Sequence, residues 1–135
     1  MQFAGRVFFI AGVYGLLVLL PQYFLEGKTG RDFPPPITHP EYYYGFVGVA
    51  VAWQVLFLML AKNPPRYHPL MIPAILEKAS FGIAVVALYV QQRVGATMLG
   101  AGIVDLMFGA LFGVAYVKVA KGGETRGSVP SEGAV

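Results

Sequence analysis

Four polar side chains interrupt long apolar stretches of this sequence, and they are its best candidates for chemistry: Gln54, Glu77, Lys78 and Asp105. Asp105 lies near the middle of the apolar segment 95–117. If that segment crosses a membrane, an acidic side chain at its centre costs about 2.5–3.5 kcal/mol on insertion scales, so such residues are rarely without a role. Two carboxylates, one ammonium and one amide could satisfy one another, or they could form a pocket for a proton, a cation or a small molecule.

The helical faces and depths of these residues indicate an interior polar cluster. Steps of three and four residues from Asp105 reach Gly102 and Gly109, and small residues allow another helix to approach closely. Equivalent stripes through Gln54 and Glu77 also contain small residues. At ~1.5 Å per residue, all three polar positions fall near the midplane of a hydrocarbon core about 30 Å thick. We therefore expect these side chains to face the interior of a helix bundle rather than lipid.

Three interpretations of the cluster follow, of which the least favoured is that these side chains face lipid by accident. In the structural one, an ion pair or a shared proton between Glu77 and Asp105 joins the third and fourth helices. In the functional one, the cluster forms a binding pocket, which a closed cavity between those two helices would favour. Lys78 could extend to the lipid headgroups or reach Asp105. We expect Glu77 or Asp105 to hydrogen-bond to another helix, with Gln54 or Lys78 as the partner.

The elements that must position these residues are membrane spans. The chain is 56% hydrophobic and 13% charged, whereas a soluble domain carries about a quarter charged residues. Stretches of ~20 mostly apolar residues can cross a membrane. Four such stretches are residues 3–20, 43–61, 70–90 and 96–117. They predict an all-α fold, an integral membrane four-helix bundle with up-down topology and short loops, over residues 1–121.

The first connection, residues 25–41, is the longest. It contains two glycines and the run Pro34–Pro35–Pro36, which predict neither a helix nor a sheet interior. We expect residues 33–40 to lie irregularly over the outer mouth of the bundle. The remaining connections are short, which predicts that consecutive helices are antiparallel neighbours. Residues 122–135 are rich in Gly, Ser, Pro and Glu and predict a disordered tail on the cytoplasmic side.

Three consecutive tyrosines, Tyr42, Tyr43 and Tyr44, precede the second span. Tyrosine is enriched where a membrane meets water, so an interfacial aromatic belt is the first interpretation. An aromatic cluster that grips a ligand is the alternative.

The loop cations indicate the orientation of the chain. Those on the side of the termini are Arg6, Lys62, Arg66, Lys118, Lys121 and Arg126, and those on the other side are Lys28, Arg31 and Arg93. Because cytoplasmic loops are enriched in Lys and Arg, both termini are predicted to be cytoplasmic. The net charge of +3 is explained by contacts with lipid headgroups, so nucleic acid is not an expected partner.

Several kinds of site are not predicted. The chain has no cysteine, so it cannot use thiol chemistry or a cysteine-ligated cluster. His39 and His68 fall in loops on opposite membrane faces and cannot share a metal. We find no phosphate-binding glycine loop and no Ser–His–Asp arrangement, so we assign no catalytic residue, metal or cofactor.

Two short motifs suggest a family. The segment Gly102–Ile–Val–Asp105–Leu–Met–Phe–Gly109–Ala–Leu–Phe resembles the last helix of small bacterial four-helix membrane proteins in the DoxX-like group. The segment Glu41–Tyr–Tyr–Tyr–Gly45 is similar to uncharacterised bacterial proteins of the same size. The resemblance implies a four-helix bundle with an accessory role beside membrane redox enzymes, and it carries over no catalytic residue.

The sequence therefore favours a small protein of the bacterial inner membrane, acting as a non-enzymatic accessory or structural subunit. Its expected partners are membrane lipids and another membrane protein or a second copy of itself. The alternative is a bundle that binds or transports a small molecule through Glu77 and Asp105. An isomerase-like enzyme that uses the same acids is the weakest of the three hypotheses.

Overall fold

The computed structural model describes residues 2–127, which form helices and, over that range, no strand. The elements in chain order are α1 (Gln2–Leu19), the 3-10 helix η1 (Leu20–Phe24), α2 (Glu26–Asp32), α3 (Pro40–Lys62), the 3-10 helix η2 (His68–Leu70), α4 (Met71–Val90) and α5 (Ala96–Gly127). The segments that contain α1, α3, α4 and α5 are each long and apolar enough to cross a membrane. The predicted all-α fold with four spans is confirmed, and the chain is an integral membrane protein.

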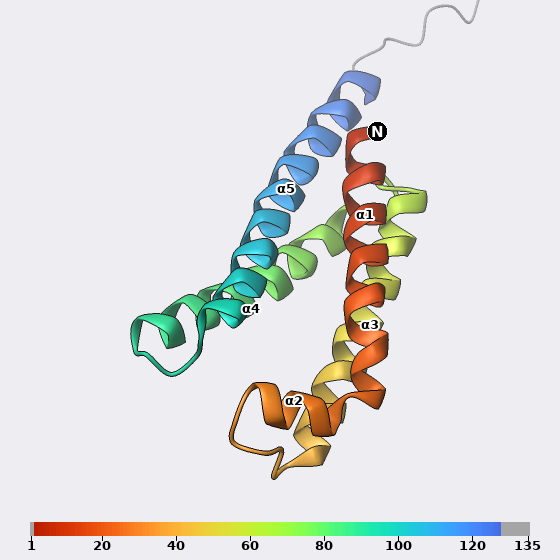
Figure 1. Cartoon of the computed structure of the whole chain (residues 1–135). Helices are drawn as coiled ribbons and strands as arrows, with labels where there is room; N and C mark the ends of the chain where they lie inside the picture. The colour runs from red at the N-terminus through yellow and green to blue at the C-terminus, as the bar shows by residue number, and fades with distance from the viewer. Residues whose placement is uncertain (1, 128–135) are drawn as a thin grey trace, which may run out of the picture.

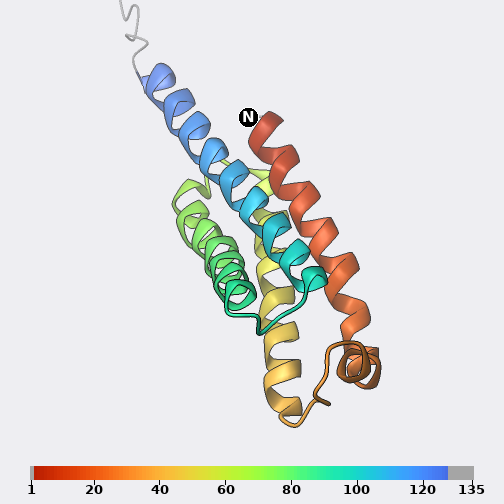
Figure 2. The same ribbon diagram turned by 60° about the vertical axis from the view of Figure 1, so that its left-hand side comes forward.

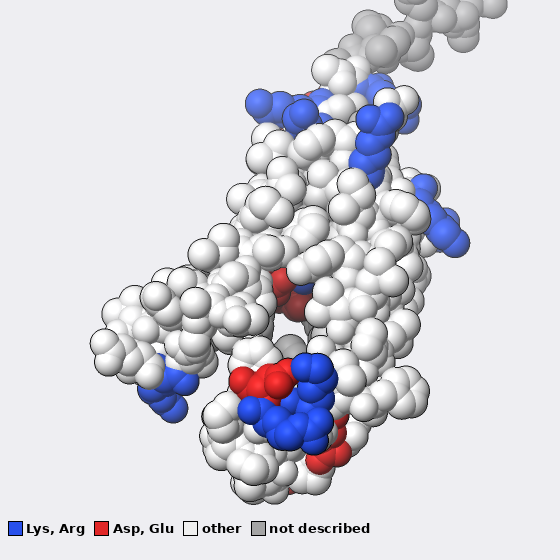
Figure 3. All heavy atoms as spheres, in the orientation of Figure 1, with Lys and Arg blue, Asp and Glu red and all other residues white. Residues whose placement is uncertain are grey.

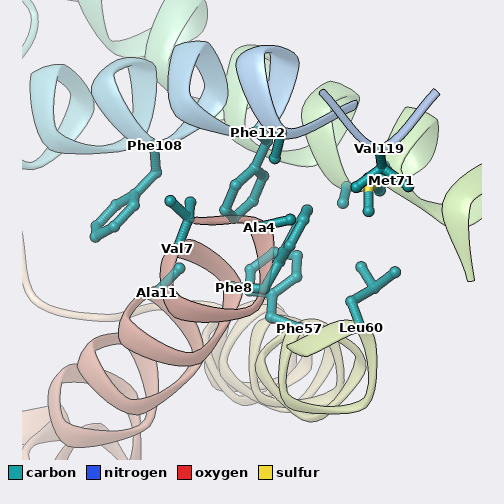
Figure 4. Packing of buried hydrophobic residues seen from close by; sticks show 12 residues of the cluster. Ala4, Val7, Phe8, Ala11, Phe57, Leu60, Met71, Phe108, Phe112 and Val119 are labelled. Atoms are coloured by element: carbon teal, nitrogen blue, oxygen red, sulfur yellow. The ribbon is translucent and has the colours of Figure 1, made fainter. Parts of the chain in front are cut away.

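The four long helices form two close pairs. α1 packs along α3, and α4 packs along α5 (Figure 1). The pairs meet mainly where α1 contacts α5, and Figure 2 shows α5 lying between α1 and α4. Figure 4 shows Phe8, Phe57 and Phe112, from α1, α3 and α5, converging at this junction. The Phe8 ring centroid is 4.3 Å from that of Phe112, and the Phe57 centroid is 5.0 Å from it.

α3 and α4 diverge, although only a short turn connects them (Figure 1). The expectation that consecutive helices are neighbours fails for this pair. The reason is the difference between the two surfaces that α4 could approach. On α5, a side chain at Gly102 would lie 2.7 Å from Val85, so the absence of one allows α4 to pack tightly there. The surface of α3 toward α4 carries bulky side chains, including Phe46 and Trp53.

The first connection contains a helix that the sequence did not lead us to expect. α2 occupies Glu26–Asp32 despite two internal glycines, each of which costs about 1 kcal/mol relative to alanine. Glu26 in its first turn and the Lys28–Asp32 ion pair stabilise it, and the prolines begin only after its end. Residues 33–39 are irregular, as predicted. They fold back on α2, where Pro36 lies beside Gly30.

The predicted boundary at residue 121 falls within α5, which continues to Gly127. The expectation of disorder is therefore wrong for residues 122–127. Thr125 hydroxyl bonds back to the Lys121 carbonyl, 3.3 Å away, so the helix continues beyond its apolar part. The rest of the predicted tail, residues 128–135, lies outside the described residues.

Candidate functional site

Lys78 is the centre of the polar cluster. Its Nζ atom lies 3.3 Å from Asp105 Oδ1 on α5 and 3.6 Å from Glu77 Oε2 on its own helix. Its side chain is only 7% exposed, and its Nζ atom lies 5.3 Å from the centroid of the Phe57 ring. Lys78 therefore reaches Asp105 rather than the headgroups. The expected hydrogen bond between Asp105 and another helix is present, with Lys78 Nζ as the donor and Asp105 Oδ1 as the acceptor.

Local helix geometry separates the two neighbours Glu77 and Lys78. Successive residues of an α-helix point about 100° apart, so the two side chains leave α4 in different directions. Lys78 points toward α5, where its Cβ atom lies 3.4 Å from the position that a side chain at Gly109 would take. Gly109 thus leaves room for the lysine stem, which is how the glycine face of α5 supports the ion pair.

Glu77 points instead toward a cleft between α3 and α4. The cleft has a volume of about 280 Å³. It is lined by Phe46, Val49, Ala50 and Trp53 from α3 and by Glu77, Ser80 and Phe81 from α4. Figure 3 shows acidic atoms at the bottom of a hollow between the α4–α5 pair and the α1–α3 pair. This cleft is open and lies between the second and third spans, whereas the sequence led us to look for a closed cavity between the third and fourth.

The Glu77 carboxylate is only partly satisfied. Its Oε2 atom is buried and has no hydrogen-bond partner among the described residues, because the 3.6 Å separation from Lys78 Nζ is too long for a hydrogen bond. Lys78 is closer to Asp105 than to Glu77, and one ammonium faces two carboxylates. The cluster can therefore accept a further hydrogen bond or a further positive charge at Glu77.

Gln54 does not belong to this cluster. It is 1% exposed, and its Nε2 atom donates to the Ala50 carbonyl of its own helix at 2.9 Å. Its amide fills the space beside Gly15 of α1, where an added Cβ would lie 2.0 Å from Oε1. Gln54 thus packs in the α1–α3 contact, and of the two partners expected for Glu77 or Asp105, Lys78 is the one that forms the bond. The side chain of Gln54 faces α1 rather than the polar cluster.

Two of the three tyrosines hold η1 and the start of the first connection against α3. Tyr43 hydroxyl donates to the Gln22 carbonyl at 2.7 Å, and Tyr44 hydroxyl donates to Glu26 Oε2 at 2.8 Å. Tyr42 is 71% exposed. The interfacial belt stays a prediction for all three, and Tyr43 and Tyr44 have an anchoring role that the sequence did not indicate.

The aromatic residues of the cleft were also missed. Phe46 and Phe81 approach each other across it, with ring centroids 6.2 Å apart. In sequence, an aromatic residue that lines a cleft looks the same as one that faces lipid. The one signal in the sequence that could have identified Phe81 is its spacing from Glu77. It lies four residues later and therefore on the same face of the helix.

No group of three or more metal-binding side chains occurs within residues 2–127. At the start of α3, His39 Nδ1 lies 3.2 Å from Glu41 Oε1. His68, which follows the end of α3, has its Nε2 atom 2.9 Å from the Tyr116 carbonyl oxygen on α5. Comparisons of the chain with protein-family models, with curated proteins and with solved structures gave no match.

Proposed function

We propose that this integral membrane protein binds a small amphipathic molecule in the cleft between α3 and α4. The observation that carries the proposal is the buried Glu77 Oε2 atom, which lacks a hydrogen-bond partner among the described residues. It belongs to a side chain that lines a cleft whose other side chains are apolar except for Ser80. Ligand sites are typically apolar hollows with a few polar groups that fix orientation. A volume of about 280 Å³ suits a small or medium-chain molecule.

Each part of the cluster has a separate role in this proposal. Glu77 accepts a hydrogen bond from the ligand, and the rings of Phe46, Trp53 and Phe81 contact its apolar body. Lys78 and Asp105 are positioning residues, because their ion pair fixes the charge beside Glu77 and joins α4 to α5. None of these residues is assigned a catalytic role.

Trp53 provides the test, because it lines the cleft and is the only tryptophan of the chain. The full chain in phosphatidylcholine vesicles is titrated with a medium-chain alcohol that carries a bromine, which quenches indole fluorescence. A ligand in the cleft gives saturable quenching, in addition to the non-saturable part that comes from partition into the bilayer.

Two matched substitutions separate the cleft from the rest of α3. Val49→Phe fills the cleft and should abolish the saturable part, whereas Val55→Phe adds the same bulk to an exposed position of α3 outside the lining and should leave it unchanged. Quenching that is non-saturable in the natural chain, or that is the same in both variants, would overturn the proposal.

The second candidate is the accessory or structural subunit that the sequence favours. The observation in its favour is the Lys78–Asp105 ion pair, which accounts for two of the buried charges as a link between α4 and α5 without any ligand. Under this candidate, the DoxX-like resemblance suggests a membrane redox enzyme as the partner. For either candidate, we propose the bacterial inner membrane as the location, with both termini cytoplasmic.

A further inference from the structure

We infer that the cleft selects cationic amphiphiles, molecules with a protonated amine on an apolar body, and that the amine binds at Glu77. This inference rests on the proposed function and adds the chemical class of its ligand. It follows from which members of the charged cluster reach the cleft, from the hydrogen-bonding capacity of the lining, and from the aromatic rings around the carboxylate.

The cleft exposes only one sign of charge. Among the described residues that line it, Glu77 alone is charged, whereas Lys78 and Asp105 lie outside the lining. Lys78 also lies nearer to Asp105 than to Glu77, at 3.3 Å against 3.6 Å. A molecule in the cleft therefore meets a carboxylate that its neighbouring ammonium only partly compensates. A cation there completes the pairing of two acids with two positive groups, and an anion is repelled.

The polar side chains on the α4 side of the cleft offer a ligand only hydrogen-bond acceptors, so they favour a ligand that donates hydrogen bonds. Glu77 Oε2 has no hydrogen-bond partner among the described residues. Ser80 Oγ already donates to the Glu77 carbonyl at 3.0 Å, so it can offer the ligand only its lone pairs. An ammonium brings three donors and no acceptor, which suits this pair of acceptors. A hydroxyl brings one donor and no charge, so it satisfies them less completely.

The apolar part of the lining also favours a cation. Phe81 lies one helical turn after Glu77, and Phe46 and Trp53 face it from α3. Aromatic faces attract ammonium groups within about 6 Å, and more strongly when the cation is desolvated. The same rings accept an alkyl or aryl body, so one molecule can use the carboxylate and the rings together.

The experiment compares three probes of equal chain length that each carry a terminal bromine: a primary amine, an alcohol and a carboxylate. Saturable quenching of Trp53 is measured in phosphatidylcholine vesicles, where the lipid itself has no net charge. The amine should bind about tenfold or more tightly than the alcohol, because both donate a hydrogen bond to the Glu77 carboxylate but only the ammonium adds the attraction of an opposite charge. The carboxylate should show no saturable quenching.

Glu77→Gln should weaken binding of the amine about tenfold or more and binding of the alcohol much less, because the amide oxygen still accepts a hydrogen bond but carries no charge. Glu124→Gln, at an exposed position of α5, is the matched control and should change neither. Phe81→Leu keeps the carboxylate and should weaken the amine more than the alcohol, which gives a second test if Glu77→Gln fails to fold. Folding of each variant is checked by circular dichroism and gel filtration.

The outcomes separate the inference from the proposed function. If amine and alcohol bind saturably with equal affinity, and Glu77→Gln affects neither, the charge selection is overturned while binding in the cleft stands. Tighter binding of the carboxylate overturns the selection as well. If no probe gives saturable quenching, the proposed function fails and the inference fails with it.

Discussion

The ammonium of Lys78 and the carboxylate of Asp105 lie 3.3 Å apart and join α4 to α5 within the membrane-spanning part of the chain. Both side chains are mostly buried, with exposed fractions of 7% and 16%. Glu77 stands 3.6 Å from the same ammonium, so one lysine serves two acids. Breaking a buried pair by removing one partner is more harmful than the net value of the pair, because the other charge remains buried.

Substitutions in this trio should therefore differ in severity. Lys78→Met leaves two buried carboxylates without a positive partner and should lower the free energy of unfolding by about 3–5 kcal/mol. Asp105→Leu should cost less, because Glu77 still faces the lysine. Asp105→Asn should cost least, because the amide oxygen still accepts a hydrogen bond. Unfolding in mixed detergent micelles measures the three values.

The double variant Lys78→Met with Asp105→Leu tests the coupling. It should be more stable than the sum of the two single effects indicates, because the second substitution removes a charge that the first left unpaired. Strictly additive effects would show that the two residues do not interact in the membrane, and the ion pair would then lose its role in positioning Glu77.

The close contact between α4 and α5 depends on glycine at Gly82. An added Cβ would lie 2.5 Å from Leu106 Cγ and 2.9 Å from the Gly102 carbonyl oxygen, which is backbone and cannot move aside. Gly82→Ala should therefore destabilise the protein by about 1–3 kcal/mol through overpacking. Gly113→Ala is the control, because nothing lies within 4 Å of its added Cβ, and it should be neutral or stabilising. Thermal unfolding of the two variants makes the comparison, and equal effects would contradict this account of the contact.

The parts of the structure that the sequence predicted are those set by single residues and by the helical period. Apolar length determined the four spans, and the glycine face of Asp105 determined which side of α5 packs on another helix. An unpaired lysine is costly to bury, so Asp105 was one of the two partners expected for Lys78. These inferences need only local geometry and the free energy of placing a charge in hydrocarbon.

The parts that the sequence did not predict depend on choices between partners. From the sequence, Gln54 could have faced either α1 or the polar cluster. It faces α1 because Gly15, in a different span, leaves room for its amide. The cleft exists because α4 packs more closely on α5 than on α3. Predicting it requires a comparison of the two surfaces, which neither segment shows by itself. The helix α2 was missed because its two glycines argued against a helix more strongly than its local Lys28–Asp32 pair argued for one, and the contact of Tyr44 with Glu26 joins different segments of the chain.

Tyr44 should control how firmly α2 is held. Its hydroxyl donates to Glu26 Oε2 at 2.8 Å, so Tyr44→Phe removes the hydrogen bond that links α3 to the first turn of α2. Trypsin can cut at Lys28 and Arg31 within α2, and cleavage there should become faster when α2 detaches. Tyr42→Phe, at an exposed tyrosine beside it, should leave the cleavage rate unchanged. Equal rates in both variants would show that the Tyr44 contact does not restrain α2.

The orientation of the chain in the membrane follows from its loop cations and can be tested at both ends. We propose that the termini are cytoplasmic, because Arg6, Lys62, Arg66, Lys118, Lys121 and Arg126 gather on their side, against Lys28, Arg31 and Arg93 on the other. A reporter that is active only in the cytoplasm should give signal when it is fused after the last residue of the chain.

Trypsin added outside intact spheroplasts should then cut α2 and leave the reporter whole. Activity only from an exported reporter, together with protection of α2, would reverse the orientation. The cleft would remain between α3 and α4 in that case, and only the side on which α2 lies would change.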